Sequence, residues 1–537
     1  MKVNTSKGLL MLLIFMGIAT LISLWSLYIY RSAIIILIVS IVLAYFVHKK
    51  GFLDFGGIST AAFGMALLVA VLAAYPYLFV TPFVDASADP AAHISSLAIH
   101  ETEPKTYAPF SELQYRYQIG FPLLAKMFID ILPFVSSNTI VWFLGVVFAF
   151  LSALLVYLLA KEIFSNEKAG MFALALFIGS KIVFQNMYWG QYTFILASVF
   201  FLATFLAFKK KSVLAYLFFP MMVASHPGVT FYALLFFMLW AVYFKEIKET
   251  FLLLLSGFIV LPVFFISYVN YIANVGAEPM VTLSFASLVS NAVVFAFWIG
   301  AFIFVLCIAS LIYAWNNKKL FGMNMFLGIV FVVSGAATIF LNASGRILGG
   351  RVIELSMFTA LLLAAYLLTQ LIESRMLEKF SFMKSKAFAS VFAIVLIVSL
   401  ALFFSSGQLT HLRHGSKINN EQIEFAYAFK TFDSDYKKTL FLTENSAKIA
   451  EVSQKIPFDV LTDYYLSYDP KIAANDPFYQ EFVRMHVLAE KARSEQCVEC
   501  IAQADFEYIV TENDFFSSEL SVKKVFEHGS YKVFVRG

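Results

Sequence analysis

Two aspartates and a histidine recur at intervals of four residues in a polar segment that directly follows a long apolar run. Asp85, Asp89 and His93 are these residues. A carboxylate can act as a general base toward an acceptor hydroxyl group, and carboxylate oxygens also ligate hard divalent cations such as Mg²⁺ or Mn²⁺. Asp85, Asp89 and His93 are therefore candidates for acid–base or metal chemistry at the membrane surface.

The proline at position 90 predicts the local structure around this acidic pair. Residues that precede a proline avoid the helical region, and proline favours the first helical turn. We therefore expect Asp89 at a helix N-cap and residues 91–100 in the helix behind it. The alternative for Asp89 is that it only caps this helix, and a lone loop aspartate such as Asp85 is ordinarily just solvated.

Cationic residues that could bind a phosphate occur in a second polar segment, residues 342–351. Arg346 and Arg351 lie there, in what the sequence predicts to be a glycine-rich turn. The planar guanidinium group suits bidentate contact with phosphate oxygens. The alternative interpretation is anchoring at the membrane interface, with Arg351 paired to Glu354 one turn later.

Four further polar residues are candidates to line a cavity next to these groups. His226 stands in a His-Pro-Gly turn between two apolar runs, although a buried structural histidine is the more frequent case. Lys181 lies near the end of an apolar run, where a lysine faces a cavity or extends to the interface. Gln191 could contact a sugar hydroxyl, but its aromatic neighbours favour an interfacial belt. Arg116 belongs to the same polar segment as the acidic pair.

The composition places all of these residues in a membrane protein. Hydrophobic residues make up 60% of the 537 residues, only 14% are charged, and 61 are phenylalanine. A soluble fold needs roughly a quarter of its residues charged. Soluble, fibrous and disordered classes are therefore excluded, and a net charge of +4 is too small to indicate a nucleic-acid partner.

Apolar runs of about 20 residues are needed to cross the hydrocarbon core of a bilayer as helices. By this criterion the sequence predicts about thirteen transmembrane helices. They are expected near residues 8–28, 32–47, 58–80, 138–160, 169–187, 191–208, 212–227, 229–244, 250–272, 290–314, 321–341, 352–371 and 387–405.

The lysines and arginines of the short loops predict the orientation. With thirteen spans, every basic cluster falls on one face, which is then cytoplasmic by the positive-inside rule. These clusters are residues 48–50, 161–168, 209–211, 245–248, 318–319 and 375–386. The N-terminus shares this face, and we expect a multi-pass protein of the cell membrane.

Two parts of the chain are then extracytoplasmic. One is the loop 81–137, which belongs to a membrane module spanning residues 1–405. The other is a small α/β domain, residues 406–537, with strands near 440–442 and 506–510, an amphipathic helix over 476–493, and a hairpin near 525–535. Cys497 and Cys500 predict a local disulfide or two inert thiols.

The end of the outer loop contains a sequence motif that is specific enough to compare with known proteins. Tyr117-Gln118-Ile119-Gly120-Phe121-Pro122-Leu123-Leu124 leads into a stretch too short to span, which we expect to form a helix in the membrane interface. An acidic pair after an outward-running span, followed by such a phrase, resembles the GT-C superfamily of membrane glycosyltransferases. This superfamily includes protein O-mannosyltransferases, oligosaccharyltransferase catalytic subunits and the lipid A aminoarabinose transferase. The next apolar run is also similar, in its end at residues 154–164.

This resemblance implies an inverting glycosyltransferase that takes a sugar from a polyprenyl-phosphate or polyprenyl-diphosphate carrier. Its acceptor would be a protein, a lipid or a glycan on the extracytoplasmic side. Asp85 and Asp89 would serve as base and metal or acceptor ligands, and Arg346, then Arg351, would hold the donor phosphate. The sequence departs from the better-known members in its Asp-x-x-x-Asp spacing and in the two extra spans before the acidic loop.

Two other functional classes are compatible with the span pattern. A transporter or flippase of lipid-linked glycans, or of another amphiphile, would need functional charges near the middle of the membrane. A non-catalytic protein could present its outer domain to a partner. The sequence has no phosphate-binding glycine loop and no His-Glu-x-x-His zinc site, which argues against a nucleotide-driven pump.

Overall fold

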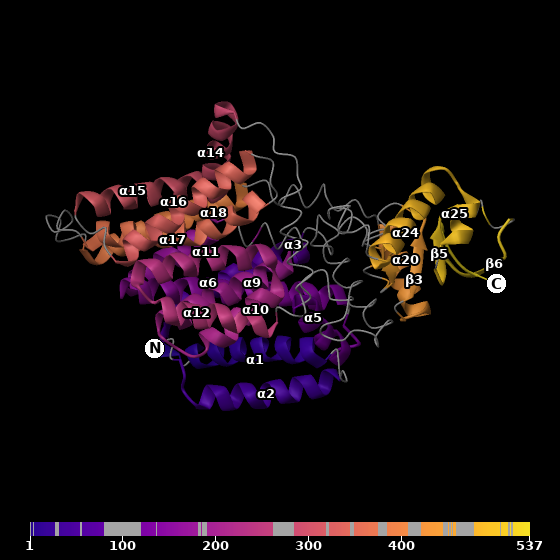
Figure 1. Cartoon of the computed structure of the whole chain (residues 1–537), viewed down its shortest axis with the longest axis horizontal. Helices are drawn as coiled ribbons and strands as arrows, with labels where there is room; N and C mark the ends of the chain where they lie inside the picture. Colours follow the sequence, from indigo (N-terminus) through magenta and orange to yellow (C-terminus); the bar gives the residue numbers. More distant parts are fainter. Residues whose placement is uncertain are drawn as a thin grey trace.

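The computed structural model divides the chain into a large helical bundle and a small unit built on a β-sheet (Figure 1). The residues that the structure describes are 2–3, 5–26, 32–53, 56–79, 120–135, 137–180, 184, 191–260, 284–317, 322–343, 348–373, 384–405, 420–435, 437–443, 449–450, 453, 455–457, 477–504, 506–513, 516 and 519–536.

Helices that pack side by side form the bundle, with a short antiparallel pair of strands beside them. The helices are α1 (Thr5–Ser26), α2 (Ala33–Lys49), α3 (Thr60–Phe79), α5 (Gly120–Ile131), α6 (Ser137–Phe164), α7 (Glu167–Ile178), α9 (Tyr192–Lys209), α10 (Ala215–Ser225), α11 (Pro227–Phe244), α12 (Ile247–Ser256), α14 (Phe285–Ile299), α15 (Ala301–Asn316), α16 (Met323–Ala343), α17 (Leu348–Glu373) and α18 (Lys384–Ser405). The strands are β1 (Lys2–Val3) and β2 (Ile58–Ser59).

Six helices of the described chain are long and apolar enough to cross a membrane. Each coincides with a span expected from the sequence: Lys7–Leu24, Thr139–Phe164, Tyr192–Lys209, Pro227–Phe244, Met323–Phe340 and Ser356–Glu373. Shorter apolar helices occupy four more of the expected positions: Ala33–Lys49, Thr60–Tyr75, Ala215–Ser225 and Phe388–Phe404. The structure therefore supports a polytopic helical membrane protein, and the count of thirteen remains a prediction.

One expected span, residues 290–314, is not a continuous helix in the described chain. It consists of parts of α14 and α15, which meet at an angle of 98°. Gly300 makes this break, because its φ of 93° lies outside the range that a residue with a side chain readily adopts. Hydropathy alone cannot detect such a break, since both helices are equally apolar.

Helix α5 differs from the sequence prediction in its surroundings. The sequence predicts a helix lying in the interface, but nine residues of α5 are buried. Helices α1, α2, α6, α9 and α10 surround it. Its only ion pair among described residues joins Lys126 and Asp130 along the helix, and Lys126 itself is buried. This helix is therefore a packed element of the bundle and not an exposed amphipathic helix.

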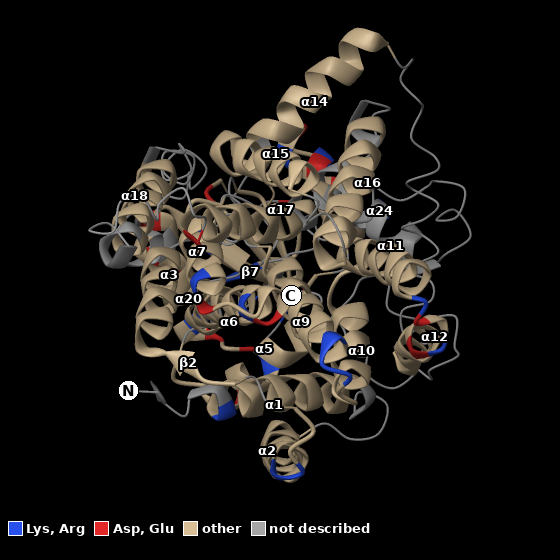
Figure 2. Cartoon of the chain, turned by 90° about the vertical axis from the view of Figure 1, so that its left-hand side faces the viewer, with Lys and Arg blue, Asp and Glu red and all other residues tan. Residues whose placement is uncertain are grey.

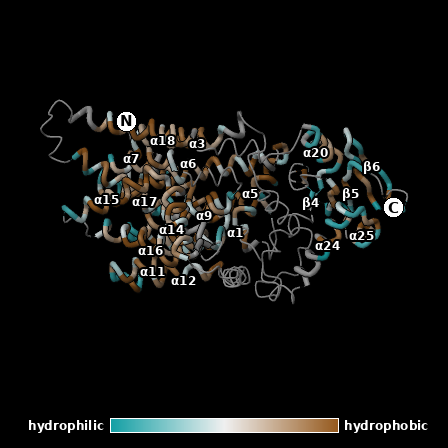
Figure 3. The backbone as a smooth tube through the Cα atoms, turned by 90° about the horizontal axis from the view of Figure 1, so that it is seen from above, coloured by the Kyte–Doolittle hydropathy of each residue, from teal (hydrophilic) through white to brown (hydrophobic). Residues whose placement is uncertain are grey.

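Aromatic side chains fill the centre of the bundle. Every residue of α9 from Tyr192 to Phe208 is buried, as expected for a helix that is apolar all round. The Phe205 ring contacts Phe236 of α11 edge-on, with 4.7 Å between ring centroids. Phe236 in turn lies 5.1 Å from Phe326 of α16. These interlocking rings fix α9, α11 and α16 against one another, and Figure 3 shows how the hydrophobic colouring dominates the bundle.

The C-terminal unit contains a five-stranded sheet in the order β4-β3-β5-β7-β6. Its strands are β3 (Lys438–Phe441), β4 (Ile456–Pro457), β5 (Tyr508–Thr511), β6 (Val522–His528) and β7 (Tyr531–Arg536). Strands β3, β4 and β5 are parallel, whereas β7 runs antiparallel to β5 and β6. The expected strands near 440–442 and 506–510 and the hairpin near 525–535 are thus confirmed.

Helices cover both faces of this sheet. Helices α24 (Pro477–Ser494) and α25 (Val498–Gln503) bury one set of strand residues, including Leu440 and Ile509. Helix α20 (Asn420–Phe432) buries the alternate set, including Phe441 and Val510. The alternation follows from the two-residue period of a strand. Cys497 and Cys500 form a disulfide at the start of α25, which settles the choice that the sequence leaves open.

Candidate functional site

One end of the bundle gathers basic loops that are far apart in the sequence. Lys161 donates to the carbonyl of Gly57 at 2.6 Å. Lys210 pairs with Glu162 at 2.8 Å, and Lys168 pairs with Glu373 at 3.3 Å. These contacts join the ends of α6, α7, α9 and α17. The described basic clusters that the sequence predicts to share one face therefore lie at one end, which faces the viewer in Figure 2.

At the opposite end of the bundle, the Gly-Phe-Pro motif at the start of α5 lies next to the predicted polar turns that contain Gln191 and His226. Helix α5 begins at Gly120, which packs directly on the backbone of Ala224, the second-last residue of α10. The next ring, Phe121, lies 5.6 Å from Tyr192 at the start of α9. Helices α5, α9, α10 and α11 thus bring Gly120, Gln191 and His226 together at this end. Figure 1 shows the C-terminal unit beyond the same end.

The absence of a side chain at residue 120 is what allows this contact. A Cβ on Gly120 would lie 2.7 Å from the carbonyl oxygen of Ala224, closer than van der Waals contact allows. We expect Gly120→Ala to push α5 away from the His226 turn and to lower the free energy of unfolding by about 1–3 kcal/mol. Thermal unfolding in detergent measures this loss.

Gly64 supplies the matched control for this substitution. It also lies within a helix, α3, and a Cβ there would meet no atom within 4 Å. Gly64→Ala should leave stability unchanged or raise it by about 0.5–1 kcal/mol, because alanine restricts the unfolded chain. Equal unfolding temperatures for the two variants would contradict the close packing of α5 on α10.

His226 is buried and acts as the N-cap of α11. Its Nδ1 atom accepts hydrogen bonds from the backbone N–H groups of Gly228 at 3.1 Å and Val229 at 3.4 Å. Pro227 follows as the first helical residue, where its missing N–H is not needed. Because Nδ1 accepts, the ring proton of the neutral imidazole is on Nε2. The edge of the imidazole also contacts Phe194 of α9, with 5.4 Å between ring centroids.

This geometry supports the structural interpretation of His226 that the sequence favours, and it provides a way to test a cavity role. Asparagine is among the best N-cap residues, whereas alanine at an N-cap costs about 1 kcal/mol. We therefore expect His226→Asn to keep the stability that His226→Ala loses, measured by thermal unfolding. If the imidazole contributes only the cap, the asparagine variant should also keep full activity. Loss of activity in His226→Asn at unchanged stability would show that Nε2 has a further role.

Of the other predicted site residues, the structure describes only Gln191 and the backbone of Arg351. Gln191 is half-buried and directly precedes α9. Arg351 lies in the first turn of α17, which begins at Leu348, so residues 348–351 of the predicted glycine-rich turn are helical. The remaining predicted residues lie outside the described part of the chain: Asp85, Asp89, His93, Arg116, Lys181 and Arg346.

The described elements that flank these residues nevertheless have defined ends. Helix α3 ends at Phe79, six residues before Asp85 in the sequence. The ring centroid of Tyr75, near this end, lies 6.4 Å from that of Phe404 near the end of α18. Helix α17 ends at Glu373 in the basic cluster. A helix of this length rises by about 1.5 Å per residue. Its first turn, with Arg351, therefore lies at the end opposite to the basic loops.

The strongest charged cluster in the described chain is in the C-terminal unit, and the sequence gives no pattern that identifies it. Lys437 donates to the Asp433 carboxylate at 2.7 Å, and the Tyr508 hydroxyl donates to the same carboxylate oxygen. Lys455 has no exposed side-chain surface and donates to the carbonyls of Asp433 and Asp435, each at 2.6 Å. The cluster ties the end of α20 to β3, β4 and β5.

Burial and these contacts shift the pKa values of the side chains in the cluster. Burial would raise the pKa of Asp433, but the hydrogen bonds from Lys437 and Tyr508 prevail and lower it to about 2. Burial lowers the pKa of Lys455 to about 8, although Asp433 opposes this shift. The bond to Asp433 raises the pKa of Lys437. Asp433 pairs with both Lys437 and Lys455, so the cluster fits a structural role better than a catalytic one.

No group of three or more His, Cys, Asp and Glu side chains suited to a metal ion occurs among the described residues. The carboxylates predicted to hold a divalent cation, Asp85 and Asp89, lie outside that part of the chain. A Mg²⁺ or Mn²⁺ requirement therefore stays a prediction.

Comparison with known proteins does not identify a family for this chain. No protein-family model and no curated protein matches the chain. Among solved structures, the chain is similar to an oligosaccharyltransferase from Archaeoglobus fulgidus, crystallised in complex with Zn and sulfate, with 14% sequence identity and a TM-score of 0.42. The match covers 83% of this chain and 67% of that one. At this identity and TM-score, the likeness identifies neither the family nor the activity.

Proposed function

We propose that the protein is an integral membrane glycosyltransferase of the GT-C type. It transfers a sugar, with inversion, from a polyprenyl-phosphate or polyprenyl-diphosphate donor to a protein, lipid or glycan acceptor. The observation that supports this proposal is that three segments lie together at one end of the bundle. They are the start of α5 at Gly120, Gln191 just before α9, and the His226 turn before α11. The helices next to the acidic loop and to the arginines, α3 and α17, reach the same end.

The reaction follows from the residue types. The acceptor oxygen attacks the anomeric carbon of the sugar as the bond from that carbon to the phosphate oxygen breaks. One carboxylate, of Asp85 or Asp89, takes the proton of the acceptor hydroxyl. Arg346 and Arg351 stabilise the charge that develops on the phosphate leaving group. A divalent cation on the second carboxylate would neutralise part of the same charge.

Orientation is part of the proposal. The basic end of the bundle faces the cytoplasm by the positive-inside rule, and the site end then faces outward. Residues 1–405 form the membrane module, and residues 406–537 form the extracytoplasmic domain. The Cys497–Cys500 disulfide is consistent with an oxidising compartment for that domain.

The experiment that tests this function supplies a short-chain polyprenyl-phosphate carrying a radiolabelled sugar to the purified protein in detergent, together with membrane extract as a source of acceptor. The expected result is label in an acceptor and release of the unloaded polyprenyl phosphate. The identity of any carrier lipid that copurifies would define whether it has one phosphate or two. Intact donor after prolonged incubation, with labelled lipid instead crossing the bilayer of proteoliposomes, would contradict the proposal.

That contradicting outcome corresponds to the second candidate, a transporter or flippase of lipid-linked glycans. The sharp break between α14 and α15 at Gly300 favours it, because transporters often use discontinuous helices. The buried charges oppose it. Within the described bundle, Lys126 is the sole buried residue of the Asp, Glu, Lys and Arg types, and it is already paired with Asp130.

A further inference from the structure

The disulfide of the C-terminal unit joins two residues of a single helical turn. Cys497 is the N-cap residue of α25, and Cys500 follows three residues later, with 5.3 Å between their Cα atoms. A disulfide stabilises a fold mainly by restricting the unfolded chain, and this effect is smallest for the shortest loops. The bond also connects no second helix or strand to α25. Its position is therefore poorly suited to holding the unit together.

Hydrogen bonds hold α25 at both ends without the help of the disulfide. The backbone N–H of Cys500 donates to Sγ of Cys497 at 3.2 Å, which is the contact that a capping side chain makes. At the other end, the Arg536 side chain donates to the carbonyls of Ala502 and Ala504 at 2.6 and 2.8 Å. The same backbone can therefore carry either the disulfide or two thiols.

The two cysteines differ in their access to solvent. Cys497 is half-buried at the edge of the core, whereas Cys500 is 7% exposed and belongs to the same buried cluster as Leu488 of α24 and Ile509 of β5. Once the bond is open, the N–H of Cys500 favours a thiolate at Cys497, because a hydrogen bond to the charged form stabilises it. An accessible thiolate in front of a sheltered second cysteine is the arrangement of a pair that exchanges disulfides.

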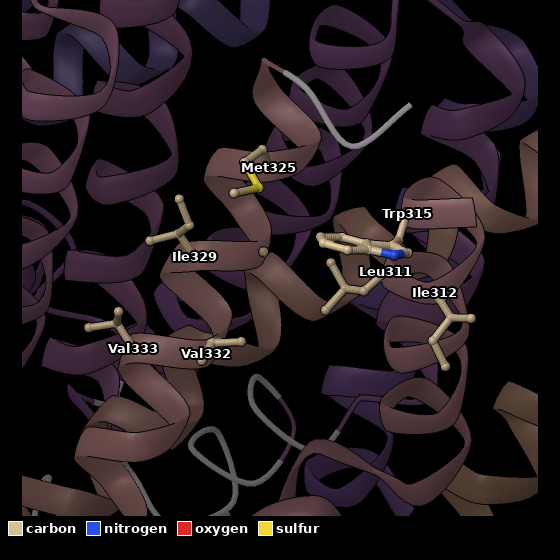
Figure 4. Close-up of a pocket in the computed structure, with 8 residues that line it drawn as sticks. Leu311, Ile312, Trp315, Met325, Ile329, Val332 and Val333 are labelled. Carbon is tan, nitrogen blue, oxygen red and sulfur yellow. The ribbon is translucent and has the colours of Figure 1, made fainter. Parts of the chain in front are cut away.

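The third cysteine of the chain has no such access. Cys307 lies in α15 and has no exposed surface. An apolar groove between α15 and α16 is lined by Leu311, one turn further along α15, and Cys307 is not among the residues that line it (Figure 4). Cys497 is therefore the most accessible of the three cysteines in the folded protein.

We propose that Cys497 and Cys500 form a redox-active pair that exchanges its disulfide with cysteine thiols from outside the chain. A partner thiolate attacks Sγ of Cys497, the bond between the two sulfurs breaks, and Cys500 leaves with the electron pair and takes up a proton. The partner is then linked to Cys497 by a mixed disulfide. A second partner thiolate attacks the partner's own sulfur and releases Cys497 as a thiolate, which takes up the second proton. The pair gains two electrons, and the two partner thiols become a disulfide.

This exchange involves neither the bundle nor the residues proposed for sugar transfer, so the result of the sugar-transfer assay has no bearing on it. The alternative is a purely structural disulfide. Such a bond would resist reduction for as long as the unit stays folded.

Reduction of the folded protein by thiols provides the test. The full-length protein in detergent micelles is incubated, without denaturant, with excess reduced glutathione or with an unstructured peptide that contains two cysteines. Free thiols are then alkylated in denaturant and assigned by peptide mass spectrometry, with the free Cys307 as the internal reference for complete alkylation. We expect reduction of Cys497 and Cys500 at a rate within about tenfold of that of the denatured chain. Hydrogen exchange should find the amides of β5 as well protected in the reduced protein as in the oxidised one.

Two variants that each keep one cysteine of the pair test the different roles of the two sulfurs. Cys500→Ser leaves Cys497 as an accessible thiol, which should form a mixed disulfide with oxidised glutathione. Cys497→Ser is the matched control, because serine is also a good N-cap residue and only the sheltered Cys500 remains. Its reaction with oxidised glutathione should be at least about tenfold slower.

Reduction by either thiol supports the proposal, and the faster reaction identifies the partner as a small molecule or a polypeptide. A disulfide that is reduced only after denaturation would overturn the proposal, and so would loss of protection in β5 on reduction. Equal reaction rates of the two variants would contradict the assignment of Cys497 as the attacked sulfur.

Discussion

Sugar transfer is expected to fall by about 10²- to 10⁴-fold when the carboxylate that accepts the acceptor proton is replaced by its amide. The substitutions are Asp89→Asn and Asp85→Asn, tested separately in the polyprenyl-phosphate transfer assay. The variant that removes the base should lose kcat with little change in KM, because the proton transfer occurs in the transition state. The variant that removes a metal ligand should instead recover part of its activity at high Mg²⁺ or Mn²⁺ concentration.

The choice of asparagine also separates catalysis from helix capping at Asp89. Asparagine caps a helix about as well as aspartate does, so Asp89→Asn should keep its unfolding temperature. Glu249→Gln is the matched control, because Glu249 is an exposed carboxylate in the first turn of α12. Unchanged transfer in both aspartate variants, with the control also unchanged, would contradict the acid–base assignment.

Replacing Asp433 with asparagine should have the largest effect on the stability of the C-terminal unit. The Asp433 side chain is 10% exposed and faces Lys455, which is fully buried. Loss of the carboxylate leaves the buried Lys455 without its ion pair, which costs about 3–5 kcal/mol for a buried pair. Lys437 keeps only the longer pair of 3.9 Å with the exposed Asp435. Hydrogen exchange of the full-length protein should show this loss in the amides of β3 and β5.

The pH dependence distinguishes this mechanism from a simple loss of packing. The pKa of Asp433 is lowered from 3.8 to about 2, so its stabilisation is present above pH 4 and disappears as the pH falls toward 2. The stability difference between wild type and Asp433→Asn should therefore shrink over that range. Lys524→Gln breaks the exposed pair with Glu527 and should cost less than about 1 kcal/mol. A difference that stays constant from pH 5 to pH 2 would contradict the ion-cluster account.

Above neutral pH, Lys455 also affects the pH dependence of stability. Its pKa is lowered to about 8 in the folded protein, so the unfolded chain binds more protons between that value and the ordinary pKa of 10.5. This group therefore makes stability rise with pH in that interval, whereas Lys437, with a raised pKa, contributes stability that is lost above 10.5.

Apolar periodicity and length predicted much of the bundle. Helices such as α6 and α9 fall where continuous apolar runs occur, because a bilayer requires about 20 such residues. The basic loops also predicted which helix ends lie together, as the Lys210–Glu162 pair shows. The strands of the C-terminal unit followed from β-branched and aromatic runs separated by a Gly529-Ser530 turn.

Features that depend on tertiary packing could not be predicted in the same way. The burial of α5 results from five neighbouring helices and not from its own pattern. The break at Gly300 needs a backbone conformation that hydropathy does not report. The Asp433 cluster unites residues from 433 to 508, so no local motif marks it. For His226, the following Pro227 was a usable signal, because a polar residue before proline is typical of a helix start.

The central claim is that acidic and basic groups act on one donor at the end of the bundle where α5 begins. A cryo-EM structure with a non-hydrolysable polyprenyl-phosphonate sugar tests it most directly. The account predicts the phosphonate within hydrogen-bonding distance of Arg346 or Arg351, with Asp85 or Asp89 beside the anomeric carbon. A phosphonate bound at the basic end of the bundle, or arginines and aspartates tens of ångströms apart, would contradict it.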